Sequence, residues 1–278
     1  MTPWLWRRLA ETALEEDVGF GDLTTDATVP PERTGTLALV ARESLVVAGL
    51  PVVPAVYALV DPDVRIEHVV EDGARVERGA VLARVHGSAR SLLTGERVVL
   101  NVLQWLSGIA TATRAVVDAV AEWSTDILDT RKTHPGWRAF EKYAVRVGGG
   151  KNHRLGLDHA VLIKDNHIAA AGGVAEAVRR ARRSVGPTVF VEVEVDDLRQ
   201  LEEALKAQPD GILLDNMDPD TLREAVRRVG GRVWTEASGG IRPDTVRAVA
   251  ATGVDAMSLG WLTHSARAVD IGADWQAP

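Results

Sequence analysis

The sequence predicts an α/β protein in which an incomplete α/β barrel of six or seven strands follows an α/β sandwich-like N-terminal domain. Three observations carry this prediction. Short β-rich runs alternate with helical patterns from about residue 125 onward, polar residues follow the ends of those runs, and the first 90 residues show a different pattern of short strands and turns. Repeated strand-then-helix units are typical of a parallel sheet covered by helices.

Six such units fill the second half of the chain. Their strands are apolar on both faces, which suits a barrel or a doubly wound sheet. The expected strands are TDILDT, AVLIK, TVFVEVEV, GILLD, RVWTEA and AMSLG, and the helices that follow them are WRAFEKYAVRV, GGVAEAVRRARRSV, DDLRQLEEALKA, DPDTLREAVRRV, RPDTVRAVAAT and THSARAVDIG. Six units instead of eight leave a barrel incomplete, or closed by another segment.

Polar residues and glycines at the strand ends favour the barrel over the doubly wound sheet, because α/β barrels place their active sites on that face. The residues at or just beyond the strand ends are Arg131, Lys132, Lys164 to His167, Glu194, Asp215, Asn216, Ser238 to Gly240 and Gly260.

The first 90 residues predict a separate, mainly β unit with flanking helices. It contains no lysine, which excludes a lipoyl or biotin carrier, since a carrier needs an acceptor lysine. Helical periodicity in SLLTGERVVLNVLQWLSGIATATRAVVDAVAEW predicts a long helix that bridges the two domains. We expect the domains to span 1–108 and 109–264, with a C-terminal tail, about 265–278, that can pack with the first.

Composition is that of a soluble globular protein, with 278 residues, a formal net charge of -7 and no cysteine. The acidic balance disfavours nucleic acid as a partner. The lack of cysteine excludes disulfides, cysteine-bound metals and a thiol nucleophile. No apolar run is long enough to span a membrane, and the N-terminus reads as an amphipathic helix rather than a signal peptide. We therefore expect a cytoplasmic protein.

The stretch DTRKTHPGWRAFEKYAVRVGGGKNHR, residues 129–154, is strongly basic. Forked guanidinium groups match carboxylates and phosphates, and a lysine neutralises phosphate as a point charge. A small, multiply charged anionic substrate is predicted, against the alternative of a solvated basic face. Candidate substrate contacts are Arg131, Lys132, His153 and Arg154. By contrast, we assign Arg138, Lys142 and Arg146, which recur at helical spacing, to a solvated or packing face, and leave Lys151 undecided.

Carboxylates and glycine-rich turns complete the candidate site. Glu192 and Glu194 share one face of their strand. Carboxylates on neighbouring strands could hold Mg²⁺, but they could equally pair with the arginines. The turns SGGI (238–241) and SLGWLTHS (258–265), each expected to open a helix, offer backbone N–H groups to a phosphate. His167 and His264 lack metal-ligand spacing and are expected to be structural.

Nine motifs together resemble one family, quinolinate phosphoribosyltransferase, also called carboxylating nicotinate-nucleotide pyrophosphorylase. They run in order from about residue 15 to 270: EDVGFGDLTT, ERVVLNVLQWLSGIAT, DTRKTHPG, EKYAVRVGGGKNHRLGL, LIKDNH, EVEV, LLDN, SGGI and LGWLTHS. The resemblance implies condensation of quinolinate with phosphoribosyl pyrophosphate, with Mg²⁺, to give nicotinate mononucleotide, pyrophosphate and CO₂. It also implies a homodimer or higher homo-oligomer.

The resemblance further implies a role for each matching residue. Quinolinate carboxylates would be held by Arg97, supplied across a dimer interface, and by Arg131, His153 and Arg154. Thr130 would also bind substrate. Phosphate and pyrophosphate oxygens would be neutralised by Lys132 and Lys164. Mg²⁺ and the ribose hydroxyls would be held by Glu194 and Asp215. The 5′-phosphate would lie against Ser238, Gly239, Gly240, Leu259, Gly260 and Trp261.

Departures from the family pattern and rival functions remain open at this point. His134, His159 and Trp261 stand where other residues are usual, which bears on loop packing and affinity rather than on reaction type. A Schiff-base aldolase using Lys164 is one rival, because a desolvated strand-end lysine can attack a carbonyl. A non-catalytic, oxyanion-binding relative of the molybdenum-locus type is the other.

Overall fold

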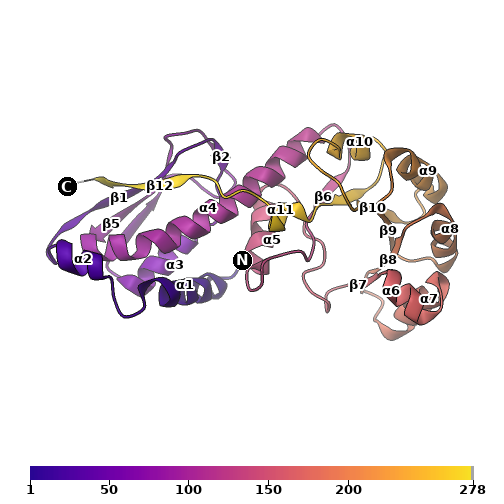
Figure 1. Ribbon diagram of the computed structural model, residues 1–278, viewed down its shortest axis with the longest axis horizontal. Coiled ribbons are helices and arrows are strands. Elements are labelled where there is room, and N and C mark those ends of the chain that lie inside the picture. Colours follow the sequence, from indigo (N-terminus) through magenta and orange to yellow (C-terminus); the bar gives the residue numbers. More distant parts are fainter. Residues whose placement is uncertain (277–278) are drawn as a thin grey trace. The chain divides into compact units, whose positions relative to one another are not determined.

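Two large sheets carry the fold, one in each of the two units into which the chain divides (Figure 1). The computed structural model describes residues 1–276. The first unit comprises residues 1–112 together with the C-terminal segment that starts at Ala266, and the second unit comprises Thr113–Ser265. The chain therefore leaves the first unit, builds the second and returns to the first.

The first unit contains a four-stranded antiparallel sheet in the order β12-β1-β5-β3. A two-stranded antiparallel ribbon of β2 and β4 accompanies it. The strands are β1 (Thr34–Ala41), β2 (Leu45–Val46), β3 (Arg65–His68), β4 (Arg75–Val76), β5 (Val81–Ser88) and β12 (Ile271–Gln276).

Helices accompany the sheet of the first unit. They are α1 (Pro3–Val18), α2 (Leu23–Thr28), α3 (Val52–Val60) and α4 (Ala89–Ala119), the last of which continues into the second unit. Proline begins α1, where its missing N–H is no loss. Trp6 and Ala10, one turn apart, are the buried residues of α1, and Tyr57 of α3 donates a hydrogen bond to the Leu92 carbonyl of α4 at 2.9 Å. Helix α4, which runs from the first unit into the second, confirms the long bridging helix that the sequence predicts.

The second unit is built on six parallel strands in the order β6-β11-β10-β9-β8-β7. The strands are β6 (Asp126–Leu128), β7 (Val161–Ile163), β8 (Val191–Val195), β9 (Gly211–Asp215), β10 (Trp234–Ser238) and β11 (Ala256–Ser258). The helices are α5 (Arg138–Val147), α6 (Asp165–Ala171), α7 (Val174–Ser184), α8 (Leu198–Ala207), α9 (Pro219–Val229), α10 (Val246–Ala250) and α11 (Trp261–His264). Figure 1 shows the helices on the outside of the curved sheet.

Local sequence explains where these helices begin. Asp197 caps α8 by accepting the Gln200 N–H at 2.7 Å. Asp218 caps α9 by accepting the Thr221 N–H at 3.0 Å, and Pro219 occupies the first helical position. Side-chain oxygens at this position satisfy backbone donors that the helix itself leaves unpaired.

No helix among residues 1–276 combines the length and the hydropathy that crossing a membrane would require.

The sheet of the second unit is an incomplete barrel, as predicted. Strands β6 and β7 form its two ends. Beside β6, Lys151 makes a single parallel bridge to Leu128, and its N–H donates to the Ile127 carbonyl at 2.8 Å. This short contact stands where a further strand would begin. It also brings the residues after Lys151 to the carboxyl end of β6.

The predicted helix over THSARAVDIG is wrong. Only Trp261–His264 is helical there, and Ile271–Gln276 forms strand β12. This strand pairs antiparallel with β1, so that Ala41 faces Ile271 and Thr36 faces Gln276. Periodicity within a short window cannot reveal this pairing, because the partner strand lies more than two hundred residues earlier in the chain.

Gly108 provides a test of the packing of α4. A Cβ at this position would lie 2.1 Å from the Arg267 carbonyl oxygen and 3.2 Å from the Ala268 Cα, and both are backbone atoms that cannot rotate away. Gly108→Ala is therefore expected to lower the free energy of unfolding by about 1–3 kcal/mol, although the same change in an exposed helix would raise it by about 1 kcal/mol. Gly186→Ala is the matched control, because its Cβ would meet no atom within 4 Å. Urea unfolding of both variants measures the difference, and a Gly108→Ala chain as stable as the control would contradict the packing.

Candidate active site

A cavity of about 550 Å³ opens at the carboxyl ends of the barrel strands. Its walls combine cations, carboxylates and a glycine-rich turn. The lining residues are Thr130, Arg131, Lys132, His153, Arg154, Leu162, Lys164, Glu194, Leu213, Asp215, Asn216, Glu236, Ser238, Gly239, Gly240 and Ser258. A smaller cavity of about 260 Å³ shares part of this wall and adds Ile241, Arg242, Leu259, Gly260, Trp261 and His264.

The two cavities thus gather the residues to which the family resemblance gives a role, with one exception. Arg97 lies on α4 in the first unit, is exposed, and is not among the residues that line either cavity. The cavity brings these residues together, and the role of each one stays a prediction.

Two guanidinium groups stand on the wall formed by the segments after β6 and after Lys151. Arg131 is exposed to the cavity, whereas Arg154 is buried and donates from Nη1 to the Ala160 carbonyl at 3.0 Å. Burial lowers the pKa of Arg154, and the positive charge of Arg131 lowers it further. The positive charges of Arg131 and Arg154 therefore repel each other, and an anion bound between them would reduce this repulsion.

Ammonium and carboxylate groups line the other side. Lys164 forms an ion pair with Glu194. Asp215 accepts a hydrogen bond from the Asn216 side chain at 2.5 Å, and burial raises the pKa of its carboxyl group. Glu194 is the last residue but one of β8 and Asp215 is the last residue of the neighbouring β9, and both expected magnesium ligands line the cavity.

These two carboxylates fit a magnesium ion. Mg²⁺ takes few protein carboxylates and fills its remaining positions with water and substrate phosphates. Both groups line a cavity that is open enough to admit such ligands. The donor set is all oxygen, as this hard cation requires.

The turn after β10 depends on glycine. Gly239 has φ of 87°, and a Cβ there would lie 2.2 Å from the Asn216 side-chain oxygen. The prediction that this turn opens a helix is wrong, because α10 begins only at Val246. The second turn does lead into a helix, but α11 has only four residues. Backbone groups of the turns, rather than long helices, face the smaller cavity.

A buried cluster of His153, Glu192 and Glu236 lies at the base of the site. The His153 Nε2 atom is 3.2 Å from a Glu192 oxygen and 3.4 Å from a Glu236 oxygen. Glu236 is fully buried at the centre of its strand. Burial raises the pKa of both carboxyl groups to about 8. The pair is therefore largely protonated at neutral pH.

The geometry of this cluster resembles a metal site, but the histidine tautomer opposes that reading. The Nδ1 atom of His153 accepts the Arg154 backbone N–H at 2.7 Å. A backbone amide can only donate, so in the neutral ring the proton must lie on Nε2. Nε2 then points its N–H toward the glutamates and offers no lone pair to a cation. Burial also lowers the pKa of His153, which favours this neutral form.

Sequence analysis missed Glu236. A signal was present, because period-two geometry places Glu236 on the same strand face as Ser238, which was assigned to the site.

The three residues that depart from the family pattern each have a partner in the structure. His134 lies 2.7 Å from Glu141, His159 accepts the Leu155 N–H at 3.2 Å, and Trp261 donates to the Ile241 carbonyl at 3.1 Å.

Glu236→Gln is expected to weaken the pH dependence of stability. The unfolded-state pKa is near the ordinary value of 4.5, and the folded-state pKa is about 8. The unfolded chain therefore releases this proton first as pH rises, so the contribution to stability is full below pH 4.5, falls between pH 4.5 and about 8, and is lost above pH 8. Glutamine does not titrate, and the decline in Tm between pH 5 and 8.5 should be shallower.

Thermal melts followed by circular dichroism measure this decline. Glu224→Gln is the control, since hydrogen bonds from Arg227 and Arg228 lower the pKa of Glu224 to about 2, below the tested window. A Glu236→Gln chain whose Tm falls as steeply as that of the unaltered chain would contradict a buried, protonated Glu236.

Known proteins share both the sequence and the fold. Profiles of the N-terminal and C-terminal domains of quinolinate phosphoribosyl transferase match residues 22–107 and 109–274. The chain is 49% identical over 268 residues to the nicotinate-nucleotide pyrophosphorylase (carboxylating) of Mycobacterium leprae, which covers 94% of each chain. It is 45% identical over 259 residues to a probable enzyme of the same name from Bacillus subtilis, covering 93% of this chain and 89% of the relative.

Solved structures agree with these matches. The nicotinate-nucleotide pyrophosphorylase of Francisella tularensis superposes with a TM-score of 0.96 at 38% identity, covering 99% of this chain and 98% of that one. NadC from Streptococcus pyogenes superposes with a TM-score of 0.95 at 42% identity, covering 99% of each chain. With both domains matched along nearly the whole sequence, the chain belongs to the quinolinate phosphoribosyltransferase family.

Proposed function

We infer that this chain transfers the phosphoribosyl group of phosphoribosyl pyrophosphate to quinolinate and removes one carboxyl group as CO₂. The products are nicotinate mononucleotide and pyrophosphate, which places the reaction in NAD biosynthesis. Membership of the family supports this function. The observation that carries it is a single cavity lined by two guanidinium groups, two ammonium groups and the carboxylates of Glu194 and Asp215.

The guanidinium wall is the proposed quinolinate site. Arg131 and Arg154 would each pair with one of the two carboxylates, because a guanidinium fork matches a carboxylate with two parallel hydrogen bonds. Thr130 lines the same wall. His153 is proposed to lie against the substrate ring or carboxylate, although its two ring nitrogens already face Arg154 N–H and the buried glutamates.

The opposite wall is the proposed phosphoribosyl site. Lys132 and Lys164 would neutralise phosphate and pyrophosphate oxygens, and Glu194 and Asp215 would face the ribose. The 5′-phosphate would lie in the smaller cavity, against Ser238, Gly239, Gly240, Leu259, Gly260 and Trp261. A Cβ on Gly260 would lie 2.9 Å from the Lys132 side chain, so the glycine lets this lysine approach the turn.

These charges match the charge changes of the reaction. Departure of pyrophosphate builds positive charge on the ribose, which fixed carboxylates stabilise, and negative charge on the leaving group, which lysines stabilise. After transfer, the ring nitrogen is positively charged, and this charge stabilises the electron pair left on the adjacent carbon when CO₂ departs. The chain therefore needs no covalent nucleophile.

Magnesium is the proposed cofactor, held by Glu194 and Asp215. When bound, it would neutralise charge on the pyrophosphate group. Its proposed ligands are the carboxylates of β8 and β9 that line the cavity.

The two rival functions are not favoured. Lys164 pairs with Glu194, and an ion-paired ammonium lacks the free electron pair that a Schiff-base aldolase needs. An oxyanion-binding protein of the molybdenum-locus type is disfavoured because the curated relatives are named as pyrophosphorylases or phosphoribosyltransferases.

We further propose a homodimer or higher homo-oligomer in which Arg97 of one subunit reaches the quinolinate site of another. Arg97 is exposed and lies outside the lining of its own chain's cavities. A cytoplasmic location, with no nucleic-acid or membrane partner, is also proposed. The net charge of -7 supports the lack of a nucleic-acid partner.

Arg131→Ala and Lys132→Ala test the proposed activity. Each removes one charge from the cavity wall, and each is expected to lower kcat/KM by about a hundredfold or more, the range for lost charge-assisted contacts. The assay follows CO₂ and nicotinate mononucleotide from quinolinate, phosphoribosyl pyrophosphate and Mg²⁺, and chelation of the ion should stop it. Undiminished turnover in both variants would refute the assignment.

Mixing two inactive variants tests the proposed role of Arg97. A hybrid of Arg97→Ala and Arg131→Ala subunits has one site in which an intact barrel meets an intact Arg97, and one site that lacks both. If Arg97 acts across a twofold interface, random reassembly should restore about a quarter of the unaltered activity, since half of the dimers are hybrids with one working site. If Arg97 acts within its own chain, mixing restores nothing.

A further inference from the structure

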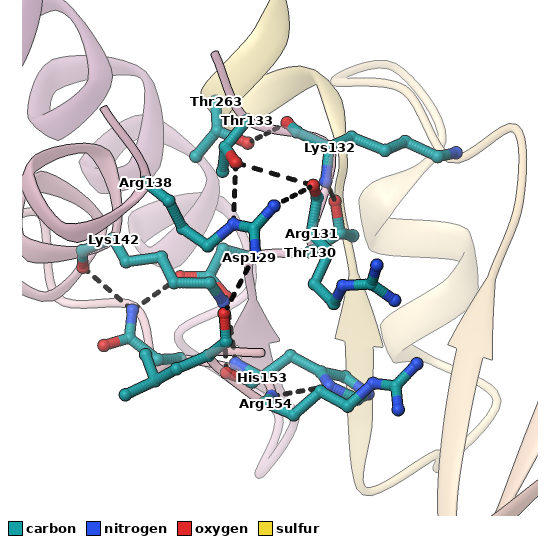
Figure 2. Close-up of polar contacts among 12 residues, drawn as sticks. Asp129, Thr130, Arg131, Lys132, Thr133, Arg138, Lys142, His153, Arg154 and Thr263 are labelled. Atoms are coloured by element: carbon teal, nitrogen blue, oxygen red, sulfur yellow. Dashed lines mark hydrogen bonds and ion pairs between the residues drawn. The ribbon is translucent and has the colours of Figure 1, made fainter. Parts of the chain in front are cut away.

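Two cations of α5 stand outside the substrate site and contact the segments that carry it. Arg138 and Lys142 lie one turn apart on α5, and Figure 2 shows both reaching toward these segments. The first arm is defined as residues 130–133, which follow β6 and include Arg131. The second arm is defined as residues 152–155, which follow the Lys151 bridge and include Arg154.

Arg138 holds both arms with one guanidinium group. Its Nε atom donates to the Thr133 hydroxyl at 2.9 Å, and its Nη2 atom donates to the Arg131 carbonyl at 3.5 Å, both in the first arm. Its Nη1 atom donates to the Leu155 carbonyl at 3.3 Å in the second arm. A planar guanidinium presents its donors in a fixed fork, so these contacts also fix the distance between the arms.

Lys142 makes a second connection deeper in the structure. Its side chain is only 1% exposed and pairs with Asp129, which is fully buried and directly precedes the first arm. Lys142 Nζ also donates to the His153 carbonyl at 3.0 Å. Asp129 in turn accepts the His153 N–H at 2.9 Å and the Asn152 side-chain N–H at 2.5 Å. The sequence assigned Lys142 to a solvated or packing face. Its side chain is packed and not solvated.

The arms need such a connection because their functional groups repel each other. Arg131 lowers the pKa of Arg154, which records the proximity of the two positive charges. Before a dianion binds, the hydrogen bonds that hold the two backbones oppose this repulsion. Flexible arms would separate and lose the spacing of two neighbouring carboxylates.

We propose that Arg138 and Lys142, with Asp129, form a clamp on α5 that sets the distance between Arg131 and Arg154 to suit the two carboxylates of quinolinate. The three are positioning residues. The proposal rests on the proposed quinolinate site. It does not extend to Lys132, which belongs to the first arm but is held separately, because its carbonyl accepts a hydrogen bond from the Thr263 hydroxyl at 2.8 Å. Phosphoribosyl pyrophosphate binding should therefore survive a loosened clamp.

Arg138→Gln is the first test, read out as binding by calorimetry. The Kd for quinolinate is expected to rise about tenfold, the effect of losing one charge-assisted hydrogen bond, while the Kd for phosphoribosyl pyrophosphate with Mg²⁺ stays within about twofold. Arg146→Gln is the matched control, because Arg146 lies two turns further along α5 and is exposed; it should change neither Kd. Equal rises in both Kd values, or no rise for quinolinate, would overturn the clamp.

A charge-neutral pair separates positioning from stability. Lys142→Met leaves Asp129 buried without its partner, so both Tm and quinolinate binding should suffer. Adding Asp129→Asn removes the unpaired charge and should restore most of the lost Tm. The Kd for quinolinate should nevertheless stay raised by about tenfold, because the second arm has lost the lysine that held its His153 carbonyl. Recovery of binding together with Tm would mean that the pair serves stability alone, and would refute the clamp.

Failure of the clamp and failure of the proposed function are distinguishable. An unaltered chain that binds quinolinate but releases no CO₂ with phosphoribosyl pyrophosphate would refute the function, and the clamp would still be judged on the two Kd values. An unaltered chain that binds no quinolinate would refute both. Normal turnover with an unaffected Arg138→Gln chain would refute the clamp alone.

Discussion

Cations of like charge can share a pocket only where the chain holds them in place against their repulsion. In this protein the buried carboxylate of Asp129 is the centre of that restraint. It accepts hydrogen bonds from the Lys142 ammonium, the Asn152 amide and the His153 backbone, and it immediately precedes the arm that carries Arg131. The pair must remain intact, because a buried charge that loses its partner costs about 3–5 kcal/mol.

The cavity around this restraint is also organised by charge. Parallel strands end at one edge of the barrel, so residues far apart in sequence reach one cavity without long loops. Two arginines stand on one wall, an ion pair and a carboxylate stand on the other, and the buried carboxyl groups of Glu192 and Glu236 contact His153. A dicarboxylate and a phosphorylated sugar therefore meet walls of different charge, which orients each substrate before any chemistry begins.

Much of this could be predicted from the sequence because the signals are local. Alternation of strands and helices, and polar residues at strand ends, lie within windows of about ten residues. Glu236 escaped notice because it sits in the middle of its strand rather than at the end, and its contact with His153 comes from another segment of the chain. The helix predicted over 263–272 failed because β12 gains its partner from the first strand of the chain.

Pairing of β12 with β1 has a consequence for the order in which the protein is made. The first unit contains residues from both ends of the chain, whereas the second is continuous. A ribosome releases the whole catalytic barrel before it releases the strand that borders β1. One edge of the N-terminal sheet therefore stays uncovered until β12 has been synthesised. Contacts between such distant segments form slowly, so the late closing of this sheet is the step at which a nascent chain is most exposed to wrong pairing.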